Sequence, residues 1–308
     1  MTNLHANQIN TSVTIAGVTL KNPVMTASGT FGSGMEYSDL TDLNGLGAVV
    51  TKGVANVPWP GNEVPRIAET PSGMLNAIGL QNPGIDTFIN RDLTFLEKYD
   101  TRVIVNVCGR SIDDYCETVK RLSDEKRVDL LEINISCPNV KEGGIAFGQD
   151  PKCAMEVTQA VKRVTDKPVI MKLSPNVTDI SEMARAVEAG GADAISLINT
   201  LTGMKIDIER RTFALANRTG GLSGPAIRPV AVRMVWQAAH AVKIPVIGMG
   251  GITCAEDAME FLMAGATAVA VGTAHFRDPG ASVKVAEGIR SFLETHGIED
   301  IHEVIGCV

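Results

Sequence analysis

Eight short aliphatic runs recur along almost the whole chain, separated by amphipathic segments, and this alternation constrains the fold more than any other feature. Aliphatic runs without regular polar alternation are typical of strands buried on both faces of a parallel sheet. Parallel neighbours need crossover connections, and the amphipathic segments are long enough to be crossover helices. The predicted strands are residues 23–28, 47–51, 102–107, 130–136, 168–173, 193–198, 244–249 and 267–272. This α/β pattern predicts a (β/α)8 TIM barrel.

Chain length and composition agree with one barrel domain spanning residues 1–308, because barrels of this size commonly form a single unit. Aromatic residues make up only 4% of the chain, so the expected core is aliphatic. Residues 189–198 and 264–273 resemble one another, each running from a helix end through glycine into a strand. A doubly wound open sheet is the alternative, with residues 28–34 as its glycine-rich turn. Eight evenly spaced units and the late glycines favour the barrel.

Local signals mark three helix starts. Ser111 with Asp114 has the spacing of a capping box, and so does Thr253 with Glu256. Residues 150–151 supply an aspartate for the N-cap and a proline for the first turn.

Residues 12–22 alternate around a glycine and predict an N-terminal β-hairpin that closes the barrel floor. Long loops in compact domains tend to be lids or binding loops. Three of the predicted βα loops are long enough to lie over the barrel mouth in this way: residues 52–83, 137–150 and 199–224.

The charge and the cysteines exclude several classes of function. The net charge is −7 and no basic block is present, which argues against nucleic acid as a partner. No run approaches the roughly 18 apolar residues of a membrane span, and the amino terminus lacks the apolar stretch of a signal peptide. The six cysteines are irregularly spaced, so we expect reduced thiols in a cytoplasmic protein and no metal cluster in this chain.

The carboxyl ends of the predicted strands carry the candidate chemistry. Cys137 directly follows a strand and is flanked by Asn134 and Asn139. A thiol there could exchange a proton with a bound ligand, although a free cysteine is more often an inert small hydrophobe. Polar residues end the other strands as well: Ser28, Lys52, Asn106, Lys172, Asn199 and Thr200. Their alternative interpretation is as solvated strand ends.

Glycines follow the last two strands, at residues 248, 250 and 251 and at residue 272 before Thr273. Backbone N–H groups at this place form the phosphate site of many barrels, although glycine also permits tight turns. Lys172 could form a Schiff base, pair with a ligand anion or reach solvent. Beside a phosphate-bearing cofactor whose ring becomes negative on reduction, it would act electrostatically.

The chain resembles dihydroorotate dehydrogenase from about residue 12 to its end. The motifs that carry the resemblance occur in order: TKG at 51–53, ETPSGMLNAIGLQNPG at 69–84, NISCPN at 134–139, GGIAFGQDP at 143–151, IMKLSPN at 170–176, LINT at 197–200, GGLSGPAI at 220–227, GMGGI at 248–252 and VGTA at 271–274. The loops 143–151 and 76–84 look most like those of the class 1B, NAD-linked catalytic subunit.

The resemblance implies a flavin mononucleotide (FMN) barrel that oxidises (S)-dihydroorotate to orotate in pyrimidine (UMP) biosynthesis. Cys137 would remove the C5 proton while hydride passes from C6 to FMN. The positions that match substrate contacts are Lys52, Asn76, Ala77, Ile78, Gly79, Leu80, Asn134, Asn199 and Thr200. The positions that match FMN contacts are Ser28, Lys52, Gly53, Asn106, Asn134, Lys172, Ile198, Gly224, Gly250, Gly251, Gly272 and Thr273.

The resemblance also implies a partner subunit that carries FAD and a [2Fe-2S] cluster and passes electrons to NAD+, in a heterotetramer of two catalytic and two electron-transfer chains. The alternative is a class 1A homodimer that uses fumarate. A tRNA-dihydrouridine synthase-like barrel is disfavoured by the acidic charge. A phosphate-binding isomerase or a non-catalytic binding subunit would leave Cys137 and the asparagines without a purpose.

Overall fold

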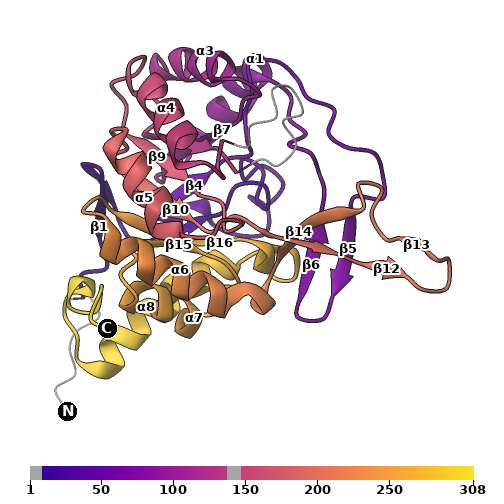
Figure 1. Ribbon diagram of the computed structural model, residues 1–308. Coiled ribbons are helices and arrows are strands. Elements are labelled where there is room, and N and C mark those ends of the chain that lie inside the picture. Colours follow the sequence, from indigo (N-terminus) through magenta and orange to yellow (C-terminus); the bar gives the residue numbers. More distant parts are fainter. Residues whose placement is uncertain (1–8, 137–146) are drawn as a thin grey trace.

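The computed structural model describes residues 9–136 and 147–308, and eight parallel strands close into a barrel in it (Figure 1). Around the barrel the order is β10-β15-β16-β3-β4-β7-β8-β9. These strands are β3 (Val24–Thr26), β4 (Ala48–Val50), β7 (Arg102–Val107), β8 (Leu130–Asn134), β9 (Val169–Lys172), β10 (Ala194–Leu197), β15 (Val246–Met249) and β16 (Ala268–Val271). Each lies within one of the eight predicted runs, so the predicted (β/α)8 barrel is confirmed.

The barrel strands are buried on both faces. Nearly every strand residue is buried, and the inner and outer faces belong to one continuous core. Helices cover the outside (Figure 1). The helices are α1 (Ile85–Thr87), the π-helix η3 (Phe88–Leu93), α2 (Thr94–Leu96), α3 (Ile112–Ser123), α4 (Pro151–Lys162), α5 (Ile180–Ala189), α6 (Arg228–Ala241), α7 (Ala255–Met263) and α8 (Ala281–His296). Short 3-10 turns are η2 (Leu43–Gly45), η4 (Pro225–Ile227), η5 (Thr273–Phe276) and η6 (Ile301–Glu303).

Two of the three predicted helix starts are confirmed. Ser111 caps α3 in a reciprocal capping box with Asp114, and the Asp150 side chain caps α4 with proline in the first turn. The predicted box of Thr253 with Glu256 is wrong. Helix α7 begins one residue later, and the Thr253 backbone N–H and hydroxyl both donate to Asp257 instead, at 2.8 and 2.6 Å.

The predicted hairpin consists of β1 (Val13–Ile15) and β2 (Val18–Leu20), paired antiparallel. It lies against the amino-terminal end of the barrel, because Arg102 at the start of β7 donates to the Thr19 carbonyl at 3.1 Å. Ile15 and Leu20 are fully buried there. The hairpin therefore closes the end opposite the mouth, as predicted.

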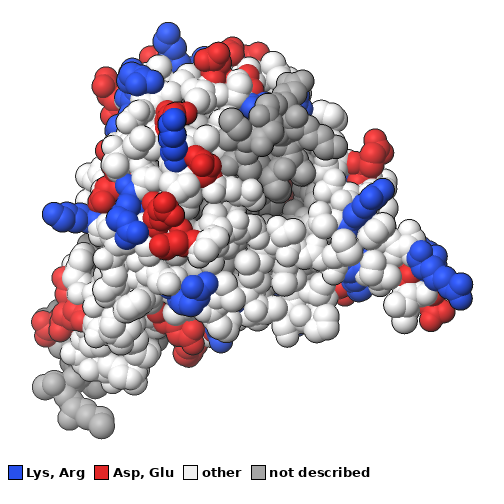
Figure 2. Space-filling view, viewed as in Figure 1, with Lys and Arg blue, Asp and Glu red and all other residues white. Residues whose placement is uncertain are grey.

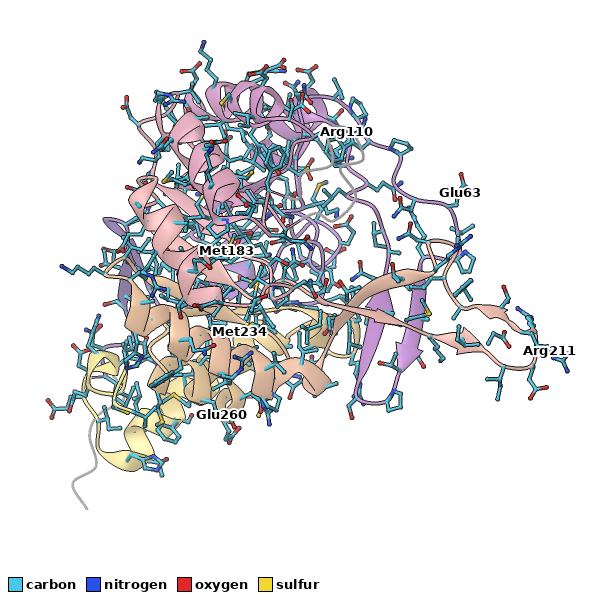
Figure 3. The ribbon with its side chains drawn as sticks, in the orientation of Figure 1. Glu63, Arg110, Met183, Arg211, Met234 and Glu260 are labelled. Atoms are coloured by element: carbon cyan, nitrogen blue, oxygen red, sulfur yellow. The ribbon has the colours of Figure 1, made fainter. Side chains whose placement is uncertain are left out.

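Two of the predicted long loops fold into a sheet of their own. Strands β5 (Ile67–Thr70) and β6 (Gly73–Asn76) pair antiparallel with β14 (Thr219–Ser223) and β11 (Leu201–Met204) in the order β11-β14-β6-β5. Beyond this sheet, β12 (Ile206–Asp207) and β13 (Thr212–Phe213) form an arm with Arg211 at its tip (Figure 3). Sequence reasoning predicted long loops but not their pairing.

Among residues 9–136 and 147–308, no helix combines the length and apolarity needed to cross a bilayer. The same residues contain no group of three or more His, Cys, Asp and Glu side chains arranged to hold a metal ion.

Candidate active site

Each of the eight barrel strands brings at least one predicted ligand-binding residue to the same rim. Parallel strands in a barrel all end at one mouth, so residues at their carboxyl ends form a ring. In barrel order these residues are Ile198 and Asn199, Gly250 and Gly251, Gly272 and Thr273, Ser28, Lys52 and Gly53, Asn106, Asn134, and Lys172. The barrel thus places residues that are up to 245 positions apart in sequence around one opening.

A buried carboxylate, Glu132 of β8, lies at the centre of the polar half of this ring. Its Oε2 accepts from Asn106 Nδ2 at 2.5 Å and lies 3.5 Å from Lys172 Nζ. Its Oε1 accepts from Ser196 Oγ at 2.7 Å. These side chains come from four adjacent strands, β7 to β10. Sequence reasoning missed Glu132, although a charged residue inside an apolar run was the signal that could have found it.

Glu132 binds the nitrogen of the Asn106 amide but not its oxygen. Its Oδ1 is buried and has no hydrogen-bond partner among the described residues. A Cβ built on Gly53 would lie 3.0 Å from this oxygen, so the acceptor lies beside the end of β4. A buried polar atom without a partner costs stability unless a ligand or water satisfies it.

A chain of amide hydrogen bonds crosses the ends of β8 and β10. Asn134 Oδ1 accepts from the Ser136 backbone N–H at 3.3 Å and from Asn199 Nδ2 at 3.4 Å. Asn199 Oδ1 in turn accepts from the Thr200 backbone N–H at 2.7 Å. Because the Asn134 oxygen already accepts two hydrogen bonds from described residues, its amide nitrogen is the group suited to donate to a ligand.

The amide chain continues into the antiparallel sheet. A Cβ on Gly221 would overlap Thr200, and Gly221 is paired with Asn76 of β6. Asn176, which the sequence analysis did not single out, ties the two parts together: its Nδ2 donates to the Thr200 carbonyl and its Oδ1 accepts from the Thr202 N–H. The structure thus brings Asn76 to the same side of the mouth as Asn134.

The rest of the predicted substrate segment, residues 77–80, packs on residues 59–66. The Asn62 side chain donates to the Ala77 carbonyl at 3.0 Å, and its backbone N–H donates to the Ile78 carbonyl. Gly79 has a φ of +74° and lies against Asn62, where a side chain would clash. Leu80 packs on a small cluster that contains Cys108, just beyond the end of β7.

Glycines follow β15 and β16, which lie across the barrel from β7 and β8. Gly250 has a φ of +135°, and a Cβ there would clash with Ala231 of α6. Gly251 has a φ of +78° and packs so closely on the Gly224 carbonyl that no side chain fits. Gly272 differs, since the nearest atom to a Cβ built on it is 3.6 Å away. At Gly250 and Gly251 the fold itself requires glycine, whereas at Gly272 a side chain has room.

An ion pair that the sequence analysis missed lies beside the glycine loop after β15. Arg228, the first residue of α6, pairs with the buried Asp257 of α7 and lies 3.5 Å from Glu260. Asp257 also accepts both hydrogen bonds from Thr253. A Cβ on Gly251 would lie 2.9 Å from the Arg228 Cβ, so this pair borders the glycine loop.

Ser28 and Lys52 follow the neighbouring strands β3 and β4. The Lys52 backbone N–H donates to the Gly32 carbonyl at 2.9 Å, and its ammonium lies 3.8 Å from a Cβ built on Gly29. Lys52 therefore lies beside the loop that contains Ser28. Cys137, the predicted base, lies outside the described residues, three positions beyond the last residue of β8.

Charged side chains of both signs are interspersed over the helices and the arm on the face drawn in Figure 2. No basic patch dominates that face, in agreement with the acidic net charge.

Comparison with known proteins gives consistent matches over nearly the whole chain. The sequence model of the family described as dihydroorotate dehydrogenase matches residues 10–293. A protein of Lachnoclostridium phytofermentans named dihydroorotate dehydrogenase B (NAD(+)), catalytic subunit, is 70% identical over 300 residues, which cover 97% of this chain and 100% of the relative. A protein of the same name from Alkaliphilus oremlandii is 63% identical over 297 residues, covering 96% and 98%.

Among solved structures, the crystal structure of DHODH from Eimeria tenella in complex with ferulenol superposes with a TM-score of 0.78. The match covers 97% of this chain and 88% of that chain at 24% identity. At this identity the likeness establishes the fold.

Proposed function

Since the chain belongs to the dihydroorotate dehydrogenase family of oxidoreductases, we propose that it oxidises (S)-dihydroorotate to orotate with FMN bound in the barrel mouth, and that the electrons pass to NAD+ through a partner subunit. The observation that carries the proposal is the ring of predicted residues contributed by all eight strands at one rim.

The described residues fit FMN. Its planar ring ends in an N–H flanked by carbonyls, and Asn106 Oδ1 is a buried acceptor that lacks a partner among the described residues. Lys172 is a buried cation on the same side of the mouth, suited to a ring that gains negative charge on reduction. Gly250, Gly251 and Gly272 would hold the phosphate through backbone N–H groups. When bound, FMN supplies the hydride acceptor.

The substrate would lie between the amide chain and the 76–80 segment. Orotate is a planar anion with ring amides and a carboxylate, so it matches asparagines that donate and accept and a nearby lysine. Asn134 has its amide nitrogen left to donate, and Lys52 supplies a cation. Cys137 would take the C5 proton as the base.

The same proposal extends to the assembly. The relatives are named catalytic subunits of an NAD(+) enzyme, and that name implies a second chain. We assign FAD and a [2Fe-2S] cluster to this electron-transfer partner, in a cytoplasmic heterotetramer of two chains of each kind. A class 1A homodimer reducing fumarate is the competing arrangement.

An anaerobic flavin assay tests the proposal. The purified chain is mixed with dihydroorotate and the visible flavin band is followed, and fumarate or NAD+ is then added separately. Bleaching that neither acceptor reverses supports a catalytic subunit awaiting its partner. Recovery with fumarate would indicate the class 1A arrangement. Absence of bleaching in the reconstituted two-subunit complex would refute the substrate assignment.

Two variants test the residue roles. Cys137→Ala should retain bound flavin but lose dihydroorotate oxidation, because the thiol serves the proton and not the cofactor. Cys153→Ala, which removes a thiol from the first turn of α4, is the matched control and should keep wild-type turnover. Lys172→Ala should weaken flavin retention or slow flavin reduction. Near-normal turnover of Cys137→Ala, or unchanged flavin content and reduction rate in Lys172→Ala, would remove the corresponding role.

A further inference from the structure

Glu132 belongs to none of the predicted contacts, yet it binds two residues that do. We propose that Glu132 is a positioning residue that acts through Asn106 and Lys172. It fixes a hydrogen-bond acceptor beside a cation in the barrel mouth, a pair that selects the N–H and carbonyl edge of a pyrimidinedione-type ring. The inference rests on the proposed function and extends it to a residue inside the barrel.

The burial of Glu132 requires that its charge be compensated from within the protein. Its side chain is 3% exposed and that of Lys172 is 6% exposed. A carboxylate held away from water is tolerated only when a cation and hydrogen-bond donors satisfy it. Lys172 supplies the cation, while Asn106 and Ser196 supply the donors. The four side chains therefore form one buried unit spanning four strands.

Glu132 determines which way the Asn106 amide faces. An ionised carboxylate can only accept hydrogen bonds, so Asn106 must present its NH2 group to Glu132 Oε2 at 2.5 Å. The Asn106 carbonyl oxygen must then face away from Glu132, where it is left unpartnered among the described residues. A neutral amide at position 132 could donate or accept, and the Asn106 amide would lose this constraint.

Glu132 also holds Lys172. Asn134 and Lys172 are register partners at the ends of β8 and β9, and Glu132 lies two residues before Asn134 on the same face of β8. Within the part of the chain that the structure describes, Glu132 is the only carboxylate recorded in an ion pair with the Lys172 ammonium. The carboxylate below therefore holds the Lys172 ammonium in place at the mouth.

The Asn106 acceptor and the Lys172 cation together match a ring edge that carries an N–H beside a carbonyl. A ring N–H would donate to Asn106 Oδ1. The Lys172 ammonium would then pair with an adjacent carbonyl oxygen or ring nitrogen that gains negative charge. The isoalloxazine ring of FMN has such an edge. Loss of Glu132 should therefore change both how tightly the ring is held and how easily it is reduced.

The test uses Glu132→Gln, which keeps the shape of the side chain and removes its charge. FMN dissociation from the purified holoprotein is measured by flavin fluorescence, and the midpoint potential of the loaded flavin is measured against reference dyes. We expect the FMN dissociation constant to rise by at least about tenfold, because a charge-assisted network is lost. We also expect the potential shifts caused by Glu132→Gln and Lys172→Met to be non-additive in the double variant.

Thr158→Val is the control for a generic core defect, since Thr158 is fully buried on α4 and, among the described residues, its hydroxyl donates to the helix carbonyl of Ala154. It should lower stability without moving FMN affinity or potential. Wild-type FMN affinity in Glu132→Gln, or strictly additive potential shifts, overturns the inference. If the wild-type protein itself fails to bind FMN, the proposed function fails instead, so the two failures are distinguishable.

Discussion

Replacement of His275 should remove a large part of the acid sensitivity of the fold. His275 is 1% exposed, packs against the stacked rings of Phe31 and Tyr37, and its Nε2 is 2.7 Å from Ser282 Oγ. Its Nδ1 has no partner among the described residues, so a proton there is poorly compensated. Burial lowers the pKa from 6.5 to about 4, against smaller opposing contributions from the Gly272 backbone and the Asp278 carboxylate.

The magnitude follows from linkage. Between these two pKa values the unfolded chain binds a proton that the folded chain does not, so stability falls as the pH drops below 6.5 and this loss is complete below about 4. With these values the loss between pH 7 and pH 5 is about 2 kcal/mol, and its limit at lower pH is about 3 kcal/mol. The pKa values of Asp278 and Asp300 are also lowered in the folded chain, but the stability that these two aspartates contribute is lost only at still lower pH, because aspartates titrate near 4 or below.

The assay is equilibrium urea unfolding of the flavin-free protein at about pH 7 and pH 5, followed by far-UV circular dichroism. At pH 7 the free energy of unfolding of His275→Gln should be lower than that of wild type. At pH 5 this difference should be smaller by about 2 kcal/mol, because wild type loses stability through His275 and the variant does not. Phe88→Leu, a defect in another buried ring, should keep a constant difference. A constant difference for His275→Gln as well would refute the reasoning.

Three further changes should separate stability from ligand retention. Ser111→Ala removes the cap of α3 and should cost about 1 kcal/mol in urea unfolding, with flavin content unchanged. Gly272→Ala should be accommodated sterically, because Ala27 lies 3.6 Å from the new Cβ, but FMN titration should show weaker binding because the methyl group crowds the proposed phosphate position. Arg228→Met leaves Asp257 buried without its cation and should cost about 2–4 kcal/mol; an unchanged melting temperature would contradict the role given to this pair.

The sequence predicted the strands well because barrel strands are specified locally, by aliphatic runs and the glycines that end them. It also predicted the rim, since the carboxyl end of each run identifies a position at the mouth. The Thr253–Glu256 box failed for a reason that is not local. Arg228 of α6 holds Asp257, and this tertiary ion pair decides which carboxylate reaches back to Thr253.

The role of Glu132 could not be predicted from the sequence either. Within its strand it is one charged residue among apolar neighbours, and nothing within ten residues of it explains that charge. Its partners Asn106, Lys172 and Ser196 lie 26 to 64 positions away and reach it only because β7 to β10 are adjacent in the closed barrel. Buried polar networks of this kind become predictable only once strand order is known.

Two arcs of the barrel rim, the ends of β7 to β10 and the ends of β15 and β16, offer different kinds of ligand-binding groups. On β7 to β10, buried side chains supply acceptors, donors and a cation that are fixed by one another, as Asn106 and Lys172 are by Glu132. Gly250, Gly251 and Gly272 follow β15 and β16, and because glycine has no side chain the backbone N–H is the one donor that each can offer. Side chains can shift the electron affinity of a ring because they carry charge, whereas backbone amides hold a phosphate whose charge does not change in the reaction. Changes on the first arc should therefore move the flavin potential, and changes at Gly272 should move FMN affinity alone.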